Sequence, residues 1–341
     1  MANIAVIGAG VVGLSTAVNI IESVPDAQVT IFADRWSPDT TSDGAGGVFS
    51  PRFTADGYGY GVPLERFRQW SKDSFKNYDS IARSADSFNA GVMAISGYKL
   101  YSKKENVAAY FSQDIIYHWK ELSPEEMKKM FPPKFKVGFF MSTVLVECQR
   151  YLPWLTRRFI RKGGKLVDRK VESLQQFAGR YDVVVNCCGL GARDLLADDV
   201  IRPLRGQVIR VKAPWIKHFY STDTDCYIYP GVDTVVLGGV KQLDNFNLEV
   251  DPGDKAKIKK NCTELVPSLK DAEFLCDWVG LRPLREPLRL EREDMKFGDR
   301  YLKVVHNYGH GQSGVGLSWG TAVEATKLVQ EALGPKTVSK L

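Results

Sequence analysis

The sequence is poor in the residues that metal centres and disulfide frameworks require. It contains 4 histidines and 6 cysteines, and the cysteines form no C-x-x-C pair. No histidine stands at zinc-finger spacing from them. Because structural zinc sites and disulfide-rich folds depend on such patterns, we expect no metal site and a reducing intracellular compartment.

Long apolar runs and dense blocks of one charge are also absent. No stretch is long enough to cross a bilayer as a helix, so we expect no membrane partner. Lys and Arg number 46 against 40 Asp and Glu, and the net charge of +6 is spread along the chain. This mild excess argues against a nucleic-acid partner, although a basic surface attracts small anions. The length of 341 residues and the hydrophobic share of 44% fit about two globular domains.

The N-terminal segment has the pattern of a β-α-β unit. Residues 4–7 are a short apolar run, typical of a buried parallel strand, and residues 8–13 carry the pattern G-x-G-x-x-G. Apolar positions at helical spacing follow over 14–21, and a β-branched run over 29–32 leads to Asp34. This order of strand, glycine-rich turn, helix, strand and acid predicts a dinucleotide-binding unit.

The residues of this unit have distinct physical roles. Gly8 permits a tight turn, Gly10 lets the backbone approach a pyrophosphate, and Gly13 lets the helix pack closely on the strand. Asp34 would accept hydrogen bonds from a ribose diol. The unit alone does not separate NAD from FAD. A second glycine-rich segment, 309–316, favours a flavin, because the amide groups of a helix start beside an isoalloxazine ring would stabilise its anionic reduced form.

The rest of the chain mixes helices with strands. A Ser-Pro-Glu-Glu segment that begins at Ser123 predicts a helix with Ser123 as its N-cap and a proline at the first helical position. Residues 182–186 form a second buried-strand pattern, and residues 200–250 alternate between apolar and polar as an antiparallel sheet does. Further helices are expected over 64–82, 151–161, 254–267 and 319–333.

These elements predict a mixed fold of the α/β and α+β classes. We expect a discontinuous Rossmann-type FAD-binding domain with an interleaved substrate-binding domain built on an antiparallel sheet. The expected FAD-binding domain comprises residues 1–50, 141–195 and 281–341. The substrate-binding domain comprises residues 51–140 and 196–280.

Several longer motifs occur in order along the whole chain. They are VIGAGVVGLSTA at 6–17, TTSD at 40–43, YLPWL at 151–155, VVNCCGL at 184–190, RGQV at 205–208, YIYPG at 227–231, GLRP at 280–283 and HNYGHG at 306–311. With these motifs the sequence resembles the FAD-dependent D-amino-acid and D-aspartate oxidases over its full length. The resemblance implies an enzyme that passes the α-hydrogen of a D-amino acid as hydride to flavin. The imino acid is then hydrolysed to a 2-oxo acid and ammonia, and O₂ reoxidises the flavin to give H₂O₂.

The resemblance also implies the residues of the site. Arg282 matches the arginine that binds the substrate α-carboxylate, and Tyr227 matches the tyrosine whose hydroxyl binds the same group. A planar guanidinium is the natural bidentate partner of a carboxylate, so we assign both residues to catalysis. The residues that match FAD contacts are Gly8, Ala9, Gly10, Val11, Val12, Gly13, Asp34, Arg35, Thr40, Thr41, Ser42, Gly46, Gly47, Val48, Val171, Cys188, Gly311, Gln312, Ser313, Gly314, Val315 and Gly316. Gly44 and Gly46 stand where relatives usually have valine and alanine, which predicts a more flexible loop.

The motifs leave open which D-amino acid is the substrate, although their residues are more similar to those of the D-aspartate branch. Ser221 stands where that branch has a lid arginine, Lys241 where it has a second arginine, and Arg52 where it has a histidine. We expect Arg52 and Lys241 to supply the charge that binds a second carboxylate; the alternative is that both are solvated surface charges. The predicted substrate-binding set is Ser50, Arg52, Tyr227, Lys241, Arg282 and Gln312.

Three other functions stay open at this point: an oxidase of neutral D-amino acids, an NAD-dependent dehydrogenase, and an amino-acid binder without activity. The final residues, Ser339-Lys340-Leu341, match the tripeptide that peroxisomal import receptors bind. An oxidase that releases H₂O₂ suits a compartment that holds catalase. We therefore expect a peroxisomal matrix enzyme with an import receptor as partner, and a homo-oligomer is left open.

Overall fold

The computed structural model describes residues 1–51, 58–104 and 113–334. The predicted β-α-β unit is confirmed: β1 (Ala2–Ile7) and β2 (Ala27–Ala33) pair in parallel and α1 (Val11–Ser23) connects them. The parallel sheet continues on both sides. β9 (Val183–Asn186) lies beside β1, and β8 (Lys165–Asp168) lies beside β2.

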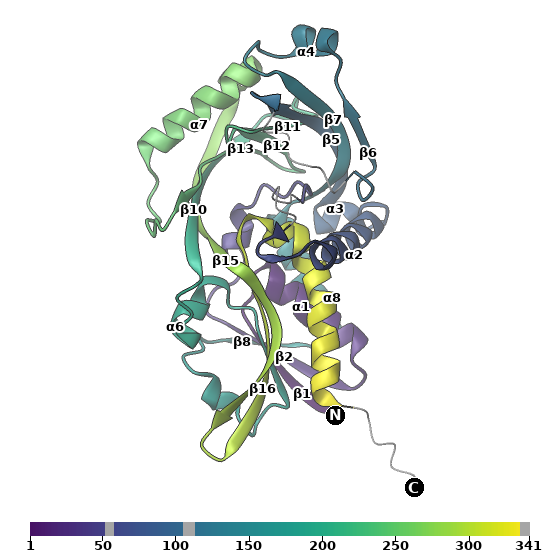
Figure 1. Cartoon of the computed structure of the whole chain (residues 1–341), viewed down its shortest axis with the longest axis vertical. Helices are drawn as coiled ribbons and strands as arrows, with labels where there is room; N and C mark the ends of the chain where they lie inside the picture. Colours follow the sequence, from purple (N-terminus) through teal and green to yellow (C-terminus); the bar gives the residue numbers. More distant parts are fainter. Residues whose placement is uncertain (52–57, 105–112, 335–341) are drawn as a thin grey trace.

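Within the described residues, these strands belong to a sheet of 14 strands that runs through the molecule (Figure 1). Its second part is mainly antiparallel, as the alternation of residues 200–250 predicts. The strands of that part, in sheet order, are β6 (His118–Glu121), β7 (Val137–Val146), β5 (Val92–Tyr101), β11 (Phe219–Thr222), β12 (Tyr227–Pro230), β13 (Val235–Gly238), β10 (Arg202–Lys212), β15 (Glu273–Phe297) and β16 (Arg300–His310), with β14 (Gln242–Leu243) beside β10. Separately, β3 (Tyr58–Gly59) pairs with β4 (Val62–Pro63).

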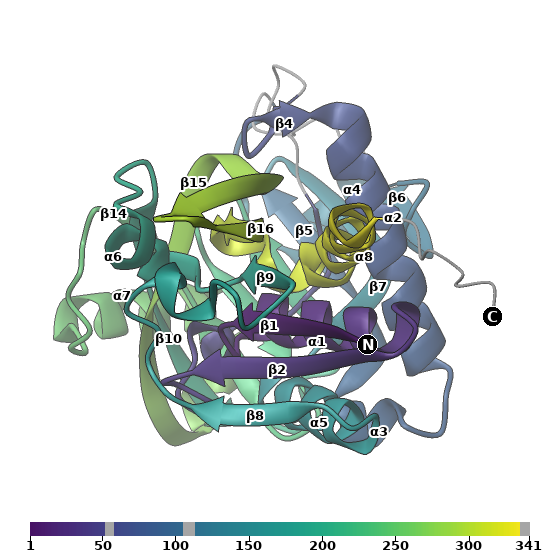
Figure 2. The ribbon, with the colours of Figure 1, turned by 90° about the horizontal axis from the view of Figure 1, so that it is seen from below.

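Helices cover the parallel part of the sheet and cap the antiparallel part (Figures 1 and 2). Helix α1 packs along α8, and α2 crosses α8. A Cβ on Gly320 of α8 would overlap the backbone of Trp70 of α2, so this glycine permits the close crossing. The helices after α1 are α2 (Leu64–Ala82), α3 (Ser87–Ala90), α4 (Pro124–Met130), α5 (Cys148–Arg161), α6 (Ala192–Leu196), α7 (Pro252–Leu265) and α8 (Gly314–Leu333).

Local sequence signals explain where several of these helices begin. Ser123 caps α4 as predicted: its hydroxyl accepts a hydrogen bond from the Glu126 amide, and the Glu126 carboxylate accepts one from the Ser123 amide. The α5 and α8 helices are confirmed, although each begins a few residues earlier than predicted. The early start of α8 places its first turn inside the glycine-rich segment 309–316.

Sequence analysis did not predict the long hairpin formed by β15 and β16. Its outer half is rich in charge, and such a segment suggests a solvated loop. In the structure the charges pair along the strand: Arg289 bonds Glu291 and Glu293, and Arg292 bonds Asp294. The pairing of β15 with both β10 and β16 joins the antiparallel strands to the parallel ones (Figure 1).

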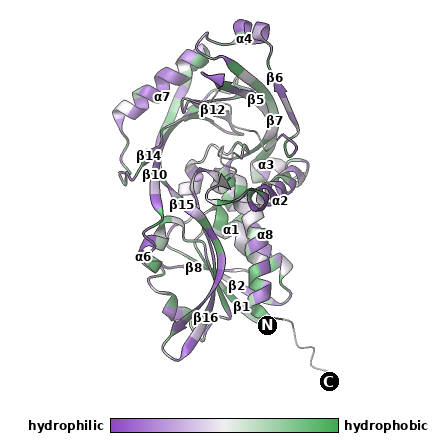
Figure 3. Cartoon of the chain, viewed as in Figure 1, coloured by the Kyte–Doolittle hydropathy of each residue, from purple (hydrophilic) through white to green (hydrophobic). Residues whose placement is uncertain are grey.

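Hydrophobic residues are concentrated in α1 and the parallel strands, while α7 consists largely of hydrophilic residues (Figure 3). Ile4, Val6, Leu14 and Ala17 are all at most 1% exposed. This packed end holds the carboxyl ends of β1 and β2 in place, and functional residues of α/β folds stand at such strand ends. In the described part of the chain, no helix has both the length and the apolar character of a membrane span.

Candidate active site

A large cavity joins the parallel strands to the antiparallel part of the sheet. Its volume is about 1140 Å³. It is lined at one end by the first glycine-rich turn and at the other by Tyr227 and Arg282. Pockets for one small molecule measure roughly 300–1,000 Å³, so this cavity has room for a dinucleotide and a small substrate.

The glycine-rich turn at the end of β1 has the geometry predicted for a dinucleotide. Gly8 has a φ of +105°, and a Cβ there would lie 2.5 Å from the carbonyl oxygen of Cys187. A Cβ on Gly13 would overlap the carbonyl of Gly8, so α1 packs closely on the strand. The Val11 amide donates to Ser42 Oγ at 3.0 Å, which ties the turn to the loop after β2.

Beyond the Val11 amide, which donates to Ser42, the first amide groups of α1 have no side-chain cap. Its N-cap residue is Gly10, which has no side chain to accept their hydrogen bonds. The uncapped amides and the positive end of the helix dipole suit a phosphate. Asp34, at the end of β2, and Arg35 line the same cavity. These residues fit the diphosphate and ribose of a dinucleotide.

The loop over residues 40–47 is held by buried hydrogen bonds. The Asp43 carboxylate, fully buried, accepts bonds from Ser37 Oγ at 2.6 Å and from the amide and hydroxyl of Thr40 at 3.0 and 2.6 Å. A Cβ on Gly44 would overlap the ring of Trp278, and one on Gly46 would lie 2.5 Å from the ring of Tyr229. Close packing against these rings, and not a need for flexibility, therefore explains the two glycines.

The second glycine-rich segment also reaches the cavity. Residues 311–313 form a short 3₁₀ turn, and α8 then starts at Gly314 without a side-chain cap. Gly311 to Gly316 line the cavity, and the Tyr60 hydroxyl hydrogen-bonds Ser313 Oγ at 3.0 Å. The cavity therefore meets two uncapped helix N-termini, one from each end of the chain.

Arg282 and Tyr227 lie together at the other end of the cavity. The Arg282 Nη1 atom donates to the carbonyl oxygens of Val240 at 3.3 Å and Arg205 at 3.4 Å. Its guanidinium also interacts with the Tyr227 hydroxyl. Burial raises the pKa of Tyr227 to about 12, and the neighbouring Arg282 charge opposes this rise. Tyr227 therefore keeps its proton at neutral pH.

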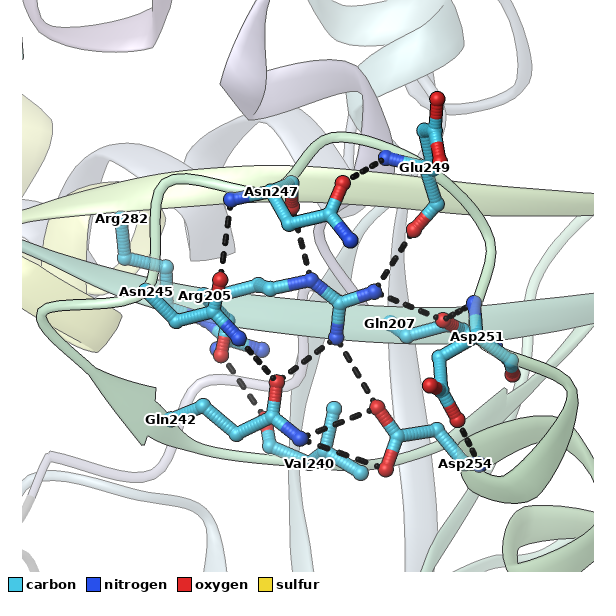
Figure 4. A network of polar contacts seen from close by, with 10 residues as sticks. All are labelled: Arg205, Gln207, Val240, Gln242, Asn245, Asn247, Glu249, Asp251, Asp254 and Arg282. Carbon is cyan, nitrogen blue, oxygen red and sulfur yellow. Dashed lines mark hydrogen bonds and ion pairs between the residues drawn. The ribbon is translucent and has the colours of Figure 1, made fainter.

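A buried network surrounds the side chain of Arg205, whose carbonyl oxygen accepts a hydrogen bond from Arg282 (Figure 4). The Arg205 side chain, 1% exposed, donates to Asp254 Oδ2 at 2.9 Å, to Gln242 Oε1 at 2.8 Å and to Gln207 Oε1 at 3.0 Å. It also donates to the carbonyl oxygens of Asn247 and Glu249. These bonds hold the segment after β14 against β10, next to the two carbonyl oxygens that Arg282 contacts.

The structure brings most of the predicted residues to this one cavity. Gly13 packs behind the turn instead of lining it, and Arg52 lies outside the described residues. The roles of the other residues remain predictions. Those that line the cavity are Gly8, Ala9, Gly10, Val11, Val12, Asp34, Arg35, Thr40, Thr41, Ser42, Gly46, Gly47, Val48, Ser50, Val171, Cys188, Tyr227, Lys241, Arg282, Gly311, Gln312, Ser313, Gly314, Val315 and Gly316.

Sequence analysis missed other lining residues. One of them is Asp225, which belongs to none of the motifs. Its Oδ1 atom lies 2.6 Å from the Nζ of Lys241, which also lines the cavity. Tyr60 and Lys99 also line the cavity. Neither belongs to a motif, and only the alternation of residues 92–101 places Lys99 on one face of a strand. Among the described residues, no cluster of three or more His, Cys, Asp or Glu side chains could hold a metal ion.

Known proteins resemble the chain over nearly its whole length. A model of the DAO family, described as FAD dependent oxidoreductase, matches residues 3–328. The D-aspartate oxidase of Homo sapiens is 41% identical, covering 97% of this chain and 96% of its own. D-aspartate oxidase 1 of Caenorhabditis elegans is 36% identical and covers 97% of each. The crystal structure of glycine oxidase from Geobacillus kaustophilus shares the fold, with a TM-score of 0.80 at 18% identity over 97% of this chain and 95% of that one. The chain therefore belongs to the DAO family of FAD-dependent oxidoreductases.

Proposed function

We propose that this protein catalyses the oxidative deamination of D-amino acids with FAD as its cofactor, and that acidic D-amino acids are its preferred substrates. A D-amino acid, O₂ and water give a 2-oxo acid, ammonia and H₂O₂. Relatives named D-aspartate oxidase, matched over nearly their full length, support this reaction. The observation that carries the proposal is the placement of Arg282 and Tyr227 in the same cavity as the two uncapped helix N-termini.

The chain's own residues bind and orient the reactants. Bound FAD would supply the acceptor for the hydride of the substrate α-carbon and the route by which the two electrons reach O₂. The amides at the N-terminus of α1 and the Asp34 carboxylate would hold the diphosphate and ribose of FAD. The residues of the second glycine-rich segment, Gly311 to Gly316, would lie against its other end.

Arg282 and Tyr227 would bind the substrate α-carboxylate. A guanidinium makes two parallel hydrogen bonds to a carboxylate, and the protonated Tyr227 hydroxyl can donate a third. Hydride transfer from a neutral amine needs no dedicated protein base, so the rate depends on how exactly these bonds orient the α-carbon. The two residues therefore act by positioning and charge, without proton transfer.

A preference for acidic substrates requires a second cation in the cavity. Lys241 lines the cavity, but its ion pair with Asp225 already offsets part of its charge. The names of the relatives support a preference for acidic substrates. Such a preference requires residues of the site that bind the second carboxylate. A neutral substrate would need no such cation, so neutral D-amino acids are the second candidate. A relative with the more general name D-amino acid oxidase, from Dugesia ryukyuensis, is 35% identical over 97% of this chain and 98% of its own.

Turnover measurements on the purified holoenzyme test this proposal. We expect D-Asp and D-Glu to give higher kcat/KM values than D-Ala and D-Met, with equal amounts of 2-oxo acid and H₂O₂ and no reaction of L-Asp. A higher value for D-Ala or D-Met would favour the neutral-substrate alternative. Binding without H₂O₂ release would favour an amino-acid binder without activity. The NAD-dependent alternative is wrong, because the family is FAD-dependent.

We also propose the two-domain division into residues 1–50, 141–195 and 281–341 for FAD and residues 51–140 and 196–280 for the substrate. The grouping of the parallel strands at one end of the molecule and the antiparallel strands at the other supports it (Figure 1). Two of the boundaries fall inside strands, since β7 extends across residue 140 and β15 across residue 280. A limited-proteolysis map of the holoenzyme would show whether the two parts separate.

The peroxisomal location stays a prediction. Ser339, Lys340 and Leu341 lie outside the described residues. Binding to an import receptor and formation of a homo-oligomer are likewise predictions. An N-terminal fluorescent fusion should colocalise with a peroxisomal marker and become diffuse when the three residues are deleted. A diffuse signal from the intact fusion would contradict the prediction.

A further inference from the structure

Three neighbouring strands carry a row of polar side chains that line the cavity. Ser221 of β11 stands opposite Tyr227 of β12 on one side and opposite Lys99 of β5 on the other. Side chains at paired positions of adjacent strands point to the same face of the sheet. All three residues line the cavity, so the row leads from the phenol of Tyr227, through a small serine, to an ammonium group.

The third member of this row, Lys99, is an unusual lysine because it is only 2% exposed. Lysine is among the residues least often buried, since removing an ammonium from water costs free energy unless hydrogen bonds or opposite charge compensate. The Lys99 Nζ atom donates to Ser50 Oγ at 3.2 Å, and Ser50 also lines the cavity. A cation thus stands in the wall of the cavity, two strands from the tyrosine that would bind the substrate α-carboxylate.

The spacing suits a substrate with two carboxylates. Adjacent strands lie about 4.8 Å apart, so the Cα atoms of Tyr227 and Lys99 are roughly 10 Å apart. All three side chains point to the same face of the sheet, and Ser221, the smallest of them, stands between the other two. A dicarboxylic amino acid held at its α-carboxylate by Arg282 and Tyr227 would extend its side chain along the row towards Lys99.

We propose that Lys99 determines the specificity for acidic D-amino acids by binding their side-chain carboxylate. The inference rests on the proposed function, because it assumes that Arg282 and Tyr227 hold the α-carboxylate. It assigns the role to a residue that is different from Lys241. The Lys241 side chain is 36% exposed and paired with Asp225, whereas Lys99 is enclosed in the cavity wall.

The test compares holoenzymes of wild type, Lys99→Met and Lys99→Arg on D-Asp, D-Glu, D-Ala and D-Met. Methionine keeps the length of the stem and removes the charge. We expect Lys99→Met to lower the ratio of kcat/KM for D-Asp to that for D-Ala by roughly 10- to 100-fold, mainly through the KM for D-Asp. Lys99→Arg should restore part of the ratio because it restores the charge. Lys120→Met, which removes an exposed lysine of β6, is the matched control and should leave the ratio unchanged.

A second measurement is independent of turnover. Malonate and propionate each have three carbons, but malonate has two carboxylates and propionate has one. The binding of either ligand should change the absorbance of the bound flavin. We expect Lys99→Met to raise the Kd of malonate by roughly 10-fold or more while the Kd of propionate changes far less. If the role of Lys99 were purely structural, Lys99→Met would raise the Kd of both ligands by similar factors and would lower the activity on D-Asp and D-Ala together.

The outcomes separate the inference from the function on which it rests. If wild type prefers D-Asp and Lys99→Met keeps that preference, the role of Lys99 is contradicted and the proposed function stands. Equal losses on D-Asp and D-Ala, or loss of bound FAD, would also overturn the specificity role. If wild type prefers D-Ala, the acidic preference itself is contradicted, and the role of Lys99 with it.

Discussion

Tyr227 on β12 lies against Arg282 on β15, although β13 and β10 separate these strands in the sheet. The two intervening strands carry glycines where the side chains cross them. A Cβ on Gly238 of β13 would overlap the Tyr227 ring, and a Cβ on Gly206 of β10 would overlap the Arg282 guanidinium. Two glycines therefore let a phenol and a guanidinium from separate strands lie side by side in the cavity.

The first prediction concerns Gly206. Gly206→Ala should displace the guanidinium of Arg282, because the new methyl group would occupy its place. Small misplacements of binding groups are costly, so we expect kcat/KM for D-Asp to fall on the order of 10- to 100-fold, mainly through KM. Gly253→Ala, in α7 and outside the cavity, is the control. Equal steady-state constants for wild type and Gly206→Ala would contradict this geometry.

The second prediction concerns the charge of Arg282. Arg282→Met should lower kcat/KM by a factor that corresponds to a loss of about 2–5 kcal/mol of transition-state stabilisation, because a charge-assisted bidentate pair is lost. Arg282→Lys should recover only part of it, since an ammonium cannot make the bidentate contact. Steady-state kinetics with FAD content as the check on folding measures this. An unchanged KM in Arg282→Met would remove Arg282 from the substrate site.

The third prediction separates a buried ion pair from an exposed one. Arg205 is 1% exposed and bonds Asp254, while nearby Arg202 is half exposed and bonds Asp244. Arg205→Met should lower the free energy of unfolding by about 3–5 kcal/mol, because it leaves polar partners unpaired. Arg202→Met should cost less than about 1 kcal/mol. Urea unfolding of the two holoenzymes gives the comparison, and equal costs would be inconsistent with the network of Figure 4.

The fourth prediction concerns the stability of the protein in acid. Burial lowers the pKa of His310 from 6.5 to about 3, and its Nε2 lies 3.1 Å from Thr321 Oγ1. Between pH 6.5 and about pH 3, His310 therefore binds a proton in the unfolded chain but not in the folded protein. Stability from this group is present above pH 6.5 and is lost as the pH falls towards 3.

Between pH 6.5 and pH 5 we expect His310 to account for a loss of about 1.5 kcal/mol in unfolding free energy. His310→Asn should remove that part of the pH dependence, whereas His118→Asn, at an exposed position, serves as the control. The measurement is urea unfolding of each variant at the two pH values. Parallel pH profiles for wild type and His310→Asn would show that His310 is not the cause.

Sequence patterns predicted the parts of this protein whose structure depends on local chemistry. The turn from Gly8 to Gly13 was predictable because Gly8 has a positive φ and Gly13 packs against Gly8 within the same turn, and α4 was predictable because Ser123 and Glu126 cap it within one turn. The motif that contains Arg282 also predicted a residue that lines the cavity. These features need few residues that are distant in the sequence.

Features that depend on strand pairing could not be predicted in this way. The outer half of β15 is rich in charged residues, and it is a strand because it pairs with β16, which the local sequence does not indicate. Lys99 resembles any lysine in an alternating strand, and its burial follows from the pairing of β5 with β11. Lys241 was predicted from its position, but its ion pair with Asp225 appears only in the folded chain.

Anaerobic mixing of the holoenzyme with D-Asp tests the central claim most directly. We predict that D-Asp bleaches the absorbance band of the oxidised flavin in a single turnover, that L-Asp does not, and that admitting O₂ restores the band with release of H₂O₂. Arg282→Met should bleach far more slowly at the same D-Asp concentration. A flavin that stays oxidised in the presence of D-Asp and of neutral D-amino acids would contradict the assignment as a D-amino-acid oxidase.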